Sequence, residues 1–263
     1  MARKPFSPSE IDTRSIVGNK PYSRFVIILL FIAIILAILF AISGFGSRWG
    51  WWHFSTGFSM MRWAAYGGIG LSVLSVIALI RLRWMRNRRG KIIGSAALLI
   101  SLLLFAIPLS MQQYARNFPP IHDITTDTET PPEFVEIIPL RADAPNPPEY
   151  EGDEVAEQQR SAYPEIEPLR TNLTPEQVYD IALEAANSMR GWEIKGQDRS
   201  EGRIEATSTT FWYGFKDDVV IRLQSENGQT VIDVRSKSRV GRGDLGVNAR
   251  RIDRYLSRVS NAM

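Results

Sequence analysis

The sequence predicts an α+β protein in which three N-terminal transmembrane helices precede a domain with a four-stranded antiparallel sheet and two packed helices. Three observations support this class. Long apolar segments fill the N-terminal part, a proline-rich acidic stretch follows, and helical and strand periodicities alternate towards the C-terminus. The expected boundaries are 1–116 for the membrane anchor, 117–170 for an acidic linker and motif-bearing loop, and 171–263 for the α+β domain.

The predicted transmembrane helices cover about residues 25–45, 63–80 and 92–111. Phe25–Ile42 is an unbroken apolar run, which at 1.5 Å per residue spans most of a roughly 30 Å hydrocarbon core. No charged residue interrupts the three spans, so they offer no path for protons or ions. The first span also resembles the core of a signal peptide, but its length favours an uncleaved anchor.

The distribution of basic residues predicts the orientation of the spans. Before residue 117 there are fourteen Lys or Arg and two acidic residues. Most of the basic residues lie in the N-terminal tail and in the loop between spans two and three: Arg3, Lys4, Arg14, Lys20 and Arg24, then Arg81, Arg83, Arg86, Arg88, Arg89 and Lys91. Because such loops stay in the cytoplasm, we expect a multi-pass inner-membrane protein with a cytoplasmic N-terminus and a periplasmic C-terminal domain.

The stretch 117–170 differs in composition from both of its neighbours. It holds ten of the fifteen prolines, and thirteen acidic residues against three basic ones. We expect little regular structure there, because such a composition neither forms helices nor buries much apolar surface.

Regular structure is predicted to resume at Thr174. The order Thr174, Pro175 and Gln177 is typical of a capping box with proline at the first helical position, and apolar residues follow at helical spacing. Four strands are expected from alternation, at residues 192–195, 203–210, 218–225 and 229–238. Asn227–Gly228 is a favourable two-residue hairpin turn between the last two strands.

A final helix is expected from about Asn248 to Val259. Ile252, Tyr255, Leu256 and Val259 should face the core, with four arginines outside, at positions 250, 251, 254 and 258. The aromatic run Phe211–Phe215 either belongs to the core or dips into the nearby bilayer surface. We expect at least two of its side chains in the core, because a small domain needs the apolar area that they bury.

Composition excludes several classes of function. The chain has no cysteine, which rules out disulfides, thiolate nucleophiles and cysteine metal sites. With His53 and His122 as the two histidines, we predict no metal site and no cofactor. The pI near 9.2 reflects basic residues beside the spans, so we expect no nucleic-acid partner.

Four motifs occur in a fixed order: Pro119–Asp127, Tyr163–Pro164, Phe215–Asp218 and Ser236–Asn248. Together they resemble the DUF1499 family of bacterial envelope and chloroplast proteins, over roughly residues 118–263. The family is one of unknown function. The resemblance therefore implies a domain boundary and an envelope location, and it supplies no activity and no catalytic residues.

The segment 236–251, called here the basic loop, holds the main candidate ligand-binding residues. They are Lys237, Arg239, Arg242, Asp244, Asn248, Arg250 and Arg251. Glycines let backbone N–H groups approach a ligand, and a helix start favours anions, so a carboxylate, a phosphate or an acidic lipid head group is the expected ligand. Alternatively, Asp244 or Asn248 caps the helix while the arginines pair with local acids such as Asp217 and Asp218.

A second set of candidates is His122, Asp123, Asp217 and Asp218, which could serve as acid and base groups. Catalysis would require His122 in a cleft beside a carboxylate at hydrogen-bond distance. A simpler interpretation is that His122 fixes its loop by a hydrogen bond. No catalytic residue is assigned on this basis.

The preferred function is a membrane-tethered extracytoplasmic binding or scaffold module that recognises an anionic envelope ligand or a membrane-protein partner. One alternative is an enzyme acting on an envelope lipid or glycan. Another is an assembly factor for a membrane complex, with its contacts in the spans. The lipid bilayer is a partner in all three cases.

Overall fold

A computed structural model of the protein describes residues 24–84 and 88–263. Arg3, Lys4, Arg14, Lys20 and Arg86 lie outside the described residues, and their cytoplasmic position stays a prediction. The chain separates into two compact units. The first comprises the described residues of Met1–Ala41 together with Ser59–Pro108, and the second comprises Ile42–Phe58 and Leu109–Met263.

Three helices, α1 (Arg24–Arg48), α2 (Phe54–Trp84) and α3 (Arg88–Ala115), are long and apolar enough to cross a membrane. Each extends beyond its predicted apolar segment, because a helix continues through polar flanks until its last turn. In the first unit, small and aliphatic side chains form the buried core: Val26, Leu29, Ala33, Leu71, Ala78, Leu82 and Ala97. Many larger apolar side chains, such as Phe31, remain exposed on the helices, as a lipid-facing surface requires.

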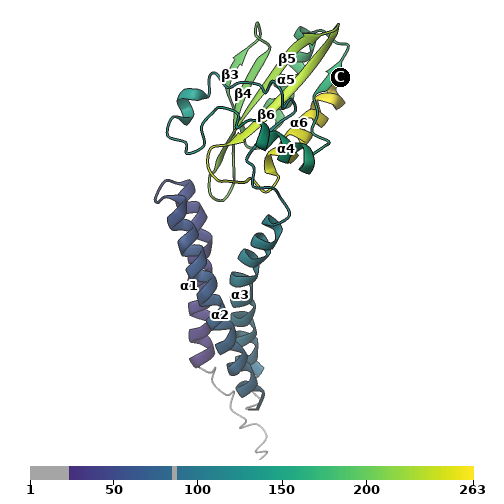
Figure 1. Ribbon diagram of the computed structural model, residues 1–263. Helices are drawn as coiled ribbons and strands as arrows, with labels where there is room; N and C mark the ends of the chain where they lie inside the picture. Colours follow the sequence, from purple (N-terminus) through teal and green to yellow (C-terminus); the bar gives the residue numbers. More distant parts are fainter. Residues whose placement is uncertain (1–23, 85–87) are drawn as a thin grey trace, which may run out of the picture. The chain divides into compact units, whose positions relative to one another are not determined.

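The second unit contains an antiparallel sheet of six strands, whereas four were expected (Figure 1). The strands are β1 (Asp123–Thr125), β2 (Leu169–Thr171), β3 (Trp192–Asp198), β4 (Arg203–Thr209), β5 (Lys216–Glu226) and β6 (Gln229–Ser238). Their order is β1-β6-β5-β4-β3, and β2 also pairs with β6. The prediction of four strands was wrong because β1 and β2, of three residues each, lie in the stretch where little regular structure was expected.

The predicted turns and caps of this domain are confirmed. Thr174 accepts a hydrogen bond from the Gln177 backbone N–H, and the Gln177 side chain accepts one in return from the Thr174 N–H. Helix α5 (Pro175–Ser188) follows. Asn227 and Gly228 both have positive φ, which is what the tight turn between β5 and β6 requires.

Helices α5 and α6 (Val247–Ala262) cover one face of the sheet. The core between these layers is made of aliphatic strand residues such as Ile204, Ile221 and Ile232, with Tyr255 from α6. Arg251 was expected outside α6, but its exposed fraction is 6%. The helical periodicity correctly predicted that Ile252 and Tyr255 face the core. It could not predict that Arg251 is buried beside Asp217, with which it forms an ion pair.

The stretch 117–170 also forms α4 (Asp153–Ala162) and a 3-10 turn, η2 (Ile138–Arg141). The Gln159 side chain of α4 donates to the Thr125 carbonyl oxygen and accepts from the Thr125 N–H, at 2.6 and 2.9 Å. The amide thereby acts as a further strand partner for the edge of β1. This stretch is part of the folded domain, although its composition is that of a linker.

Candidate binding site

The face of the sheet opposite α5 and α6, called here the polar face, carries buried charged and hydroxyl side chains. They alternate with the core residues along β1, β4, β5 and β6, because successive strand residues point to opposite faces. The buried members are Asp123, Glu205, Thr207, Asp218, Asp233, Arg235 and Lys237. Burying so many charges requires partners for all of them.

Asp218 is the centre of one ion-pair cluster. It is fully buried, and Arg239 donates to its two carboxylate oxygens at 2.8 Å each. Arg141 Nη1 lies 3.2 Å from Asp218 Oδ2, and the Thr207 hydroxyl donates to Oδ1 at 2.8 Å. One carboxylate therefore serves two guanidinium groups, which leaves this end of the polar face with excess positive charge.

Asp123 is the centre of a second cluster. Arg235 donates to both of its oxygens at 2.9 and 2.8 Å, and Lys237 Nζ lies 3.1 Å from Oδ2. Lys237 also contacts Glu151, at 3.2 Å. His122 Nε2 lies 2.9 Å from the same Glu151 oxygen, so the carboxylate beside His122 is Glu151, a residue that the sequence did not single out.

Residues 127–151, called here the covering segment, lie across the polar face and supply many of its remaining partners. Carbonyl oxygens of Pro132, Pro148 and Glu149 accept from Arg235 and Lys237. In the opposite sense, three successive backbone N–H groups, those of Val135, Glu136 and Ile137, donate to Glu205. The segment is ordered because charged side chains of the sheet satisfy its backbone, as strand neighbours would elsewhere.

The helix start in the basic loop is already occupied by a carboxylate of the chain. Asp244 accepts from the N–H groups of Gly246 and Asn248 at 2.8 and 2.6 Å. Burial raises the pKa of Asp244 above its ordinary value, although these two donors favour the charged form. The anion site predicted at the start of α6 is therefore filled by Asp244.

The other residues of the basic loop divide into buried and exposed sets. Arg251 pairs with Asp217 and also donates to Ser236 and Asn248, all of them buried. Arg250 is exposed, donates to the Leu245 carbonyl oxygen at 3.0 Å and lies over the Phe118 ring. Arg242 is exposed, and its side chain forms no ion pair or hydrogen bond with the described residues 24–84 and 88–263.

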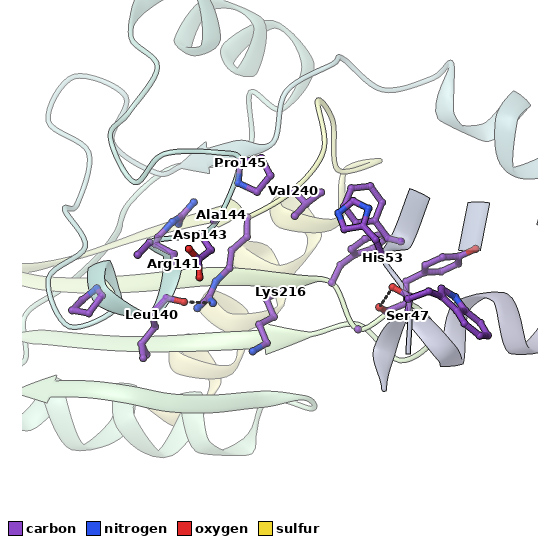
Figure 2. Close-up of a pocket in the computed structure, with 17 residues that line it drawn as sticks. Ser47, His53, Leu140, Arg141, Asp143, Ala144, Pro145, Lys216 and Val240 are labelled. Atoms are coloured by element: carbon purple, nitrogen blue, oxygen red, sulfur yellow. Dashed lines mark hydrogen bonds between the residues drawn. The ribbon is translucent and has the colours of Figure 1, made fainter. Parts of the chain in front are cut away.

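A cavity of about 380 Å³ opens at the end of the polar face where Asp218 lies. Its walls come from segments far apart in the sequence: Ser47 and residues 52–54, residues 139–145, residues 213–216, and Arg239 with Val240. Figure 2 shows Leu140, Arg141 and Asp143 on one side of it, and His53 and Ser47 on the other. All of these residues belong to the second unit.

The wall near Ser47 is held by an aromatic cluster. Tyr213 is 6% exposed, stacks on Phe215 at 5.4 Å between ring centroids and packs against Phe58 at 4.8 Å. Arg48 donates to the carbonyl oxygens of Thr210 and Phe211 at 2.7 and 2.9 Å. The loop between β4 and β5 is thereby fixed to the ends of α1 and α2, and Phe211 stays exposed.

Three basic side chains, Arg141, Lys216 and Arg239, and one acidic side chain, Asp143, line the cavity. Burial lowers the pKa of the Arg141 guanidinium; Asp218 opposes this effect, and the nearby Arg239 lowers the pKa further. Arg141 Nε is buried and has no hydrogen-bond partner among the residues that the structure describes. Lys216 is exposed at the cavity. The side chains that line the cavity therefore carry more positive than negative charge.

Sequence reasoning found Arg239 but missed Arg141 and Lys216. Arg141 lies in the stretch expected to be a linker, and Lys216 lies inside a family motif that carries no assigned role. Among the described residues, no group of three or more His, Asp or Glu side chains is arranged to hold a metal ion. The carboxylates of Asp123, Asp217 and Asp218 are each paired with basic side chains.

A family model described as "Protein of unknown function (DUF1499)" matches residues 123–259, just over half of the chain. No curated protein and no solved structure matches the chain significantly. The matched range contains β1, the covering segment, the whole polar face and most of α6, and it excludes the three apolar helices. The chain belongs to the DUF1499 family, whose function is unknown.

Proposed function

We propose that this protein is a multi-pass inner-membrane protein whose periplasmic domain binds an anionic envelope ligand in the cavity beside Asp218. The observation that carries the proposal is the charge of that cavity. Arg141, Arg239 and Lys216 line it together with the acidic Asp143, and the buried Asp218 is shared by the two arginines, so three positive charges face two negative ones. Binding of an anion would supply the missing negative charge.

The proposed site differs from the one that the sequence suggested. Of the basic loop, Arg239 and Val240 line the cavity. Lys237, Asn248 and Arg251 are buried in ion pairs and hydrogen bonds, so they act as structural residues that hold the loop. The ligand-binding role is therefore assigned to one end of the loop and to two side chains from other segments.

Binding is favoured over catalysis because the carboxylates proposed as acid and base groups are neutralised by ion pairs. Asp217, Asp218 and Asp123 each accept from an arginine within hydrogen-bond distance. His122 is 8% exposed and does not line the cavity. Glu151 lies beside His122, but a general base also needs a cleft in which it reaches a substrate proton, and the cavity described above does not include His122.

The orientation is tested with reporter fusions. Alkaline phosphatase, which is active only in the periplasm, should be active when fused after Met111 and inactive when fused near Arg86. The expectation follows from the basic residues that flank the second and third spans. Activities in the reverse pattern would overturn the periplasmic placement of the domain.

Anion binding is tested on the full chain in a neutral detergent, with inorganic phosphate as the probe and chloride at equal ionic strength as the reference. Phosphate should raise the melting temperature in a concentration-dependent way, because a ligand that binds the native state stabilises it. The variant Lys216→Gln should show a smaller rise. Arg242→Gln, which removes the same charge outside the cavity, is the matched control, and an equal loss in both variants would contradict the site.

A further inference from the structure

One wall of the cavity comes from the segment that joins α1 to α2, which belongs to the second unit. Ser47 belongs to the last turn of α1, Trp52 and His53 lie in the short connection to α2, and Phe54 is the first residue of α2. A connection of five residues between two membrane-spanning helices has to lie at the bilayer surface. Tryptophans at positions 49, 51 and 52 are typical of that interface.

Specific contacts hold the side chains of this wall in place. Trp52 Nε1 donates to the Ser43 carbonyl oxygen at 3.0 Å, and its ring lies where a Cβ on Gly46 would come within 2.1 Å. A Cβ on Gly57 would lie 3.0 Å from the Tyr213 ring and 2.4 Å from the Ser43 carbonyl oxygen. Glycine at both positions allows the aromatic side chains to approach the helices.

The opposite wall carries the charge. Arg141 has an exposed fraction of 3%. Its Nη1 lies 3.2 Å from Asp218 Oδ2 and its Nη2 donates to the Asn146 carbonyl oxygen at 2.9 Å, so it contributes charge to the cavity from a buried position. The Arg239 guanidinium donates to Asp218 and to the Leu140 carbonyl oxygen. Its contribution to ligand binding is therefore mainly its positive charge and not a free hydrogen-bond donor. Lys216 is the exposed cation that can move towards a ligand.

We propose that the cavity binds the phosphodiester head group of a phospholipid from the membrane that holds the spans. Lys216 faces the phosphate, Arg141 and Arg239 contribute positive charge from behind the cavity wall, and Trp52 and Phe54 lie on the bilayer side. This assignment rests on the proposed anion-binding function and names its ligand class. A volume of about 380 Å³ accommodates a head group, while the acyl chains remain in the bilayer.

Asp143 refines the expectation for the head group. It is exposed at the cavity, where it repels negative charge. For an anionic head group such as phosphatidylglycerol, Asp143→Asn should therefore strengthen binding. Lys216→Gln should weaken binding by at least about tenfold, because it removes a charged hydrogen-bond donor to the phosphate.

The test is native mass spectrometry of the full chain released from vesicles that contain phosphatidylglycerol and phosphatidylcholine in equal amounts. The wild type should retain phosphatidylglycerol preferentially, Lys216→Gln should lose that preference, and Asp143→Asn should increase it. Arg242→Gln removes the same charge as Lys216→Gln at an exposed position outside the cavity, so it is the matched control and should behave as the wild type.

A parallel titration with sn-glycerol 3-phosphate in neutral detergent separates the two levels of the proposal. If the soluble phosphate ester binds in a Lys216-dependent way and no phosphatidylglycerol is retained selectively, the lipid assignment is overturned while anion binding stands. If neither probe binds, both proposals fail. Retention that is selective yet unchanged by Lys216→Gln and Asp143→Asn would place the lipid elsewhere on the protein and overturn the site.

Discussion

On the face that packs against α5 and α6, the strands bury aliphatic side chains such as Ile204, Ile221 and Ile232, whereas the polar face buries Asp218 and Arg235. The first face is closed by regular helices. The second is closed by the covering segment, which has almost no regular structure. Apolar side chains need only matching surface, but buried charges need donors and acceptors, and an irregular backbone can present both.

The two faces should also contribute differently to the free energy of unfolding. Apolar burial stabilises in proportion to area, at about 25 cal/mol per Å². A buried ion pair stabilises little compared with apolar residues of the same shape, yet removing one partner is costly. We therefore expect single substitutions to lower the free energy of unfolding more on the polar face than on the apolar face.

The largest loss is expected for Asp218→Asn. This substitution leaves Arg239 and Arg141 without their shared counter-charge in a buried position, which should cost about 3–5 kcal/mol. Chemical unfolding of the full chain in detergent measures it. The double variant Asp218→Asn with Arg239→Gln should lose less than the sum of the single variants, and strict additivity would show that the pair is not coupled.

A loss of similar or smaller size is expected on the opposite face for Ile221→Ala. Ile221 is fully buried among the core residues, and truncation leaves a cavity, so about 2–5 kcal/mol should be lost. Ile221→Val should cost only about 0.5–1.5 kcal/mol. If the aliphatic substitutions prove harmless, the sheet face under α5 and α6 is not the main core of the domain.

A still smaller effect is expected at the cap of α6. Asp244→Ala removes the acceptor for the N–H groups of Gly246 and Asn248 and should cost about 1 kcal/mol. Asp244→Asn keeps an acceptor and removes the titration, which makes it the matched control.

The pH dependence at Asp244 has a defined sign. Because burial raises the pKa of Asp244, its contribution to stability is fully present below the ordinary value of 3.8 and is lost as pH rises through the folded-state pKa. Melting temperatures of the wild type should therefore fall relative to those of Asp244→Asn as pH rises from acid to neutral. A constant difference across that range would contradict the burial of an ionising carboxylate.

The parts of the fold that sequence predicted have local signals. The capping box at Thr174, the turn at Asn227–Gly228 and the three apolar segments all depend on residues close in the chain. Strands β1 and β2 were missed because three residues are too few to show alternation, and their pairing partner β6 lies far along the chain. The proline and acidic content of the covering segment predicted an irregular backbone. It could not predict that hydrogen bonds from Arg235 and to Glu205 hold that backbone in one conformation.

The candidate site was only partly predictable for the same reason. Positive charge in the basic loop is visible in the sequence, but the partners that bury it are not. Asp123 pairs with Arg235 across 112 positions, and Leu140 accepts from Arg239 across 99. Contacts between distant segments decide which arginines are structural and which are available to a ligand. A local sequence pattern does not predict such contacts.

The most direct test of this division compares Arg239→Gln with Arg242→Gln, two identical charge changes in one loop. The free energy of unfolding of the full chain in detergent should fall by about 3–5 kcal/mol for Arg239→Gln, because Asp218 loses its bidentate partner. Arg242 is exposed, so Arg242→Gln should change the free energy of unfolding by no more than about 0.5 kcal/mol. Equal small changes in both variants, or a larger loss for Arg242→Gln, would contradict the account.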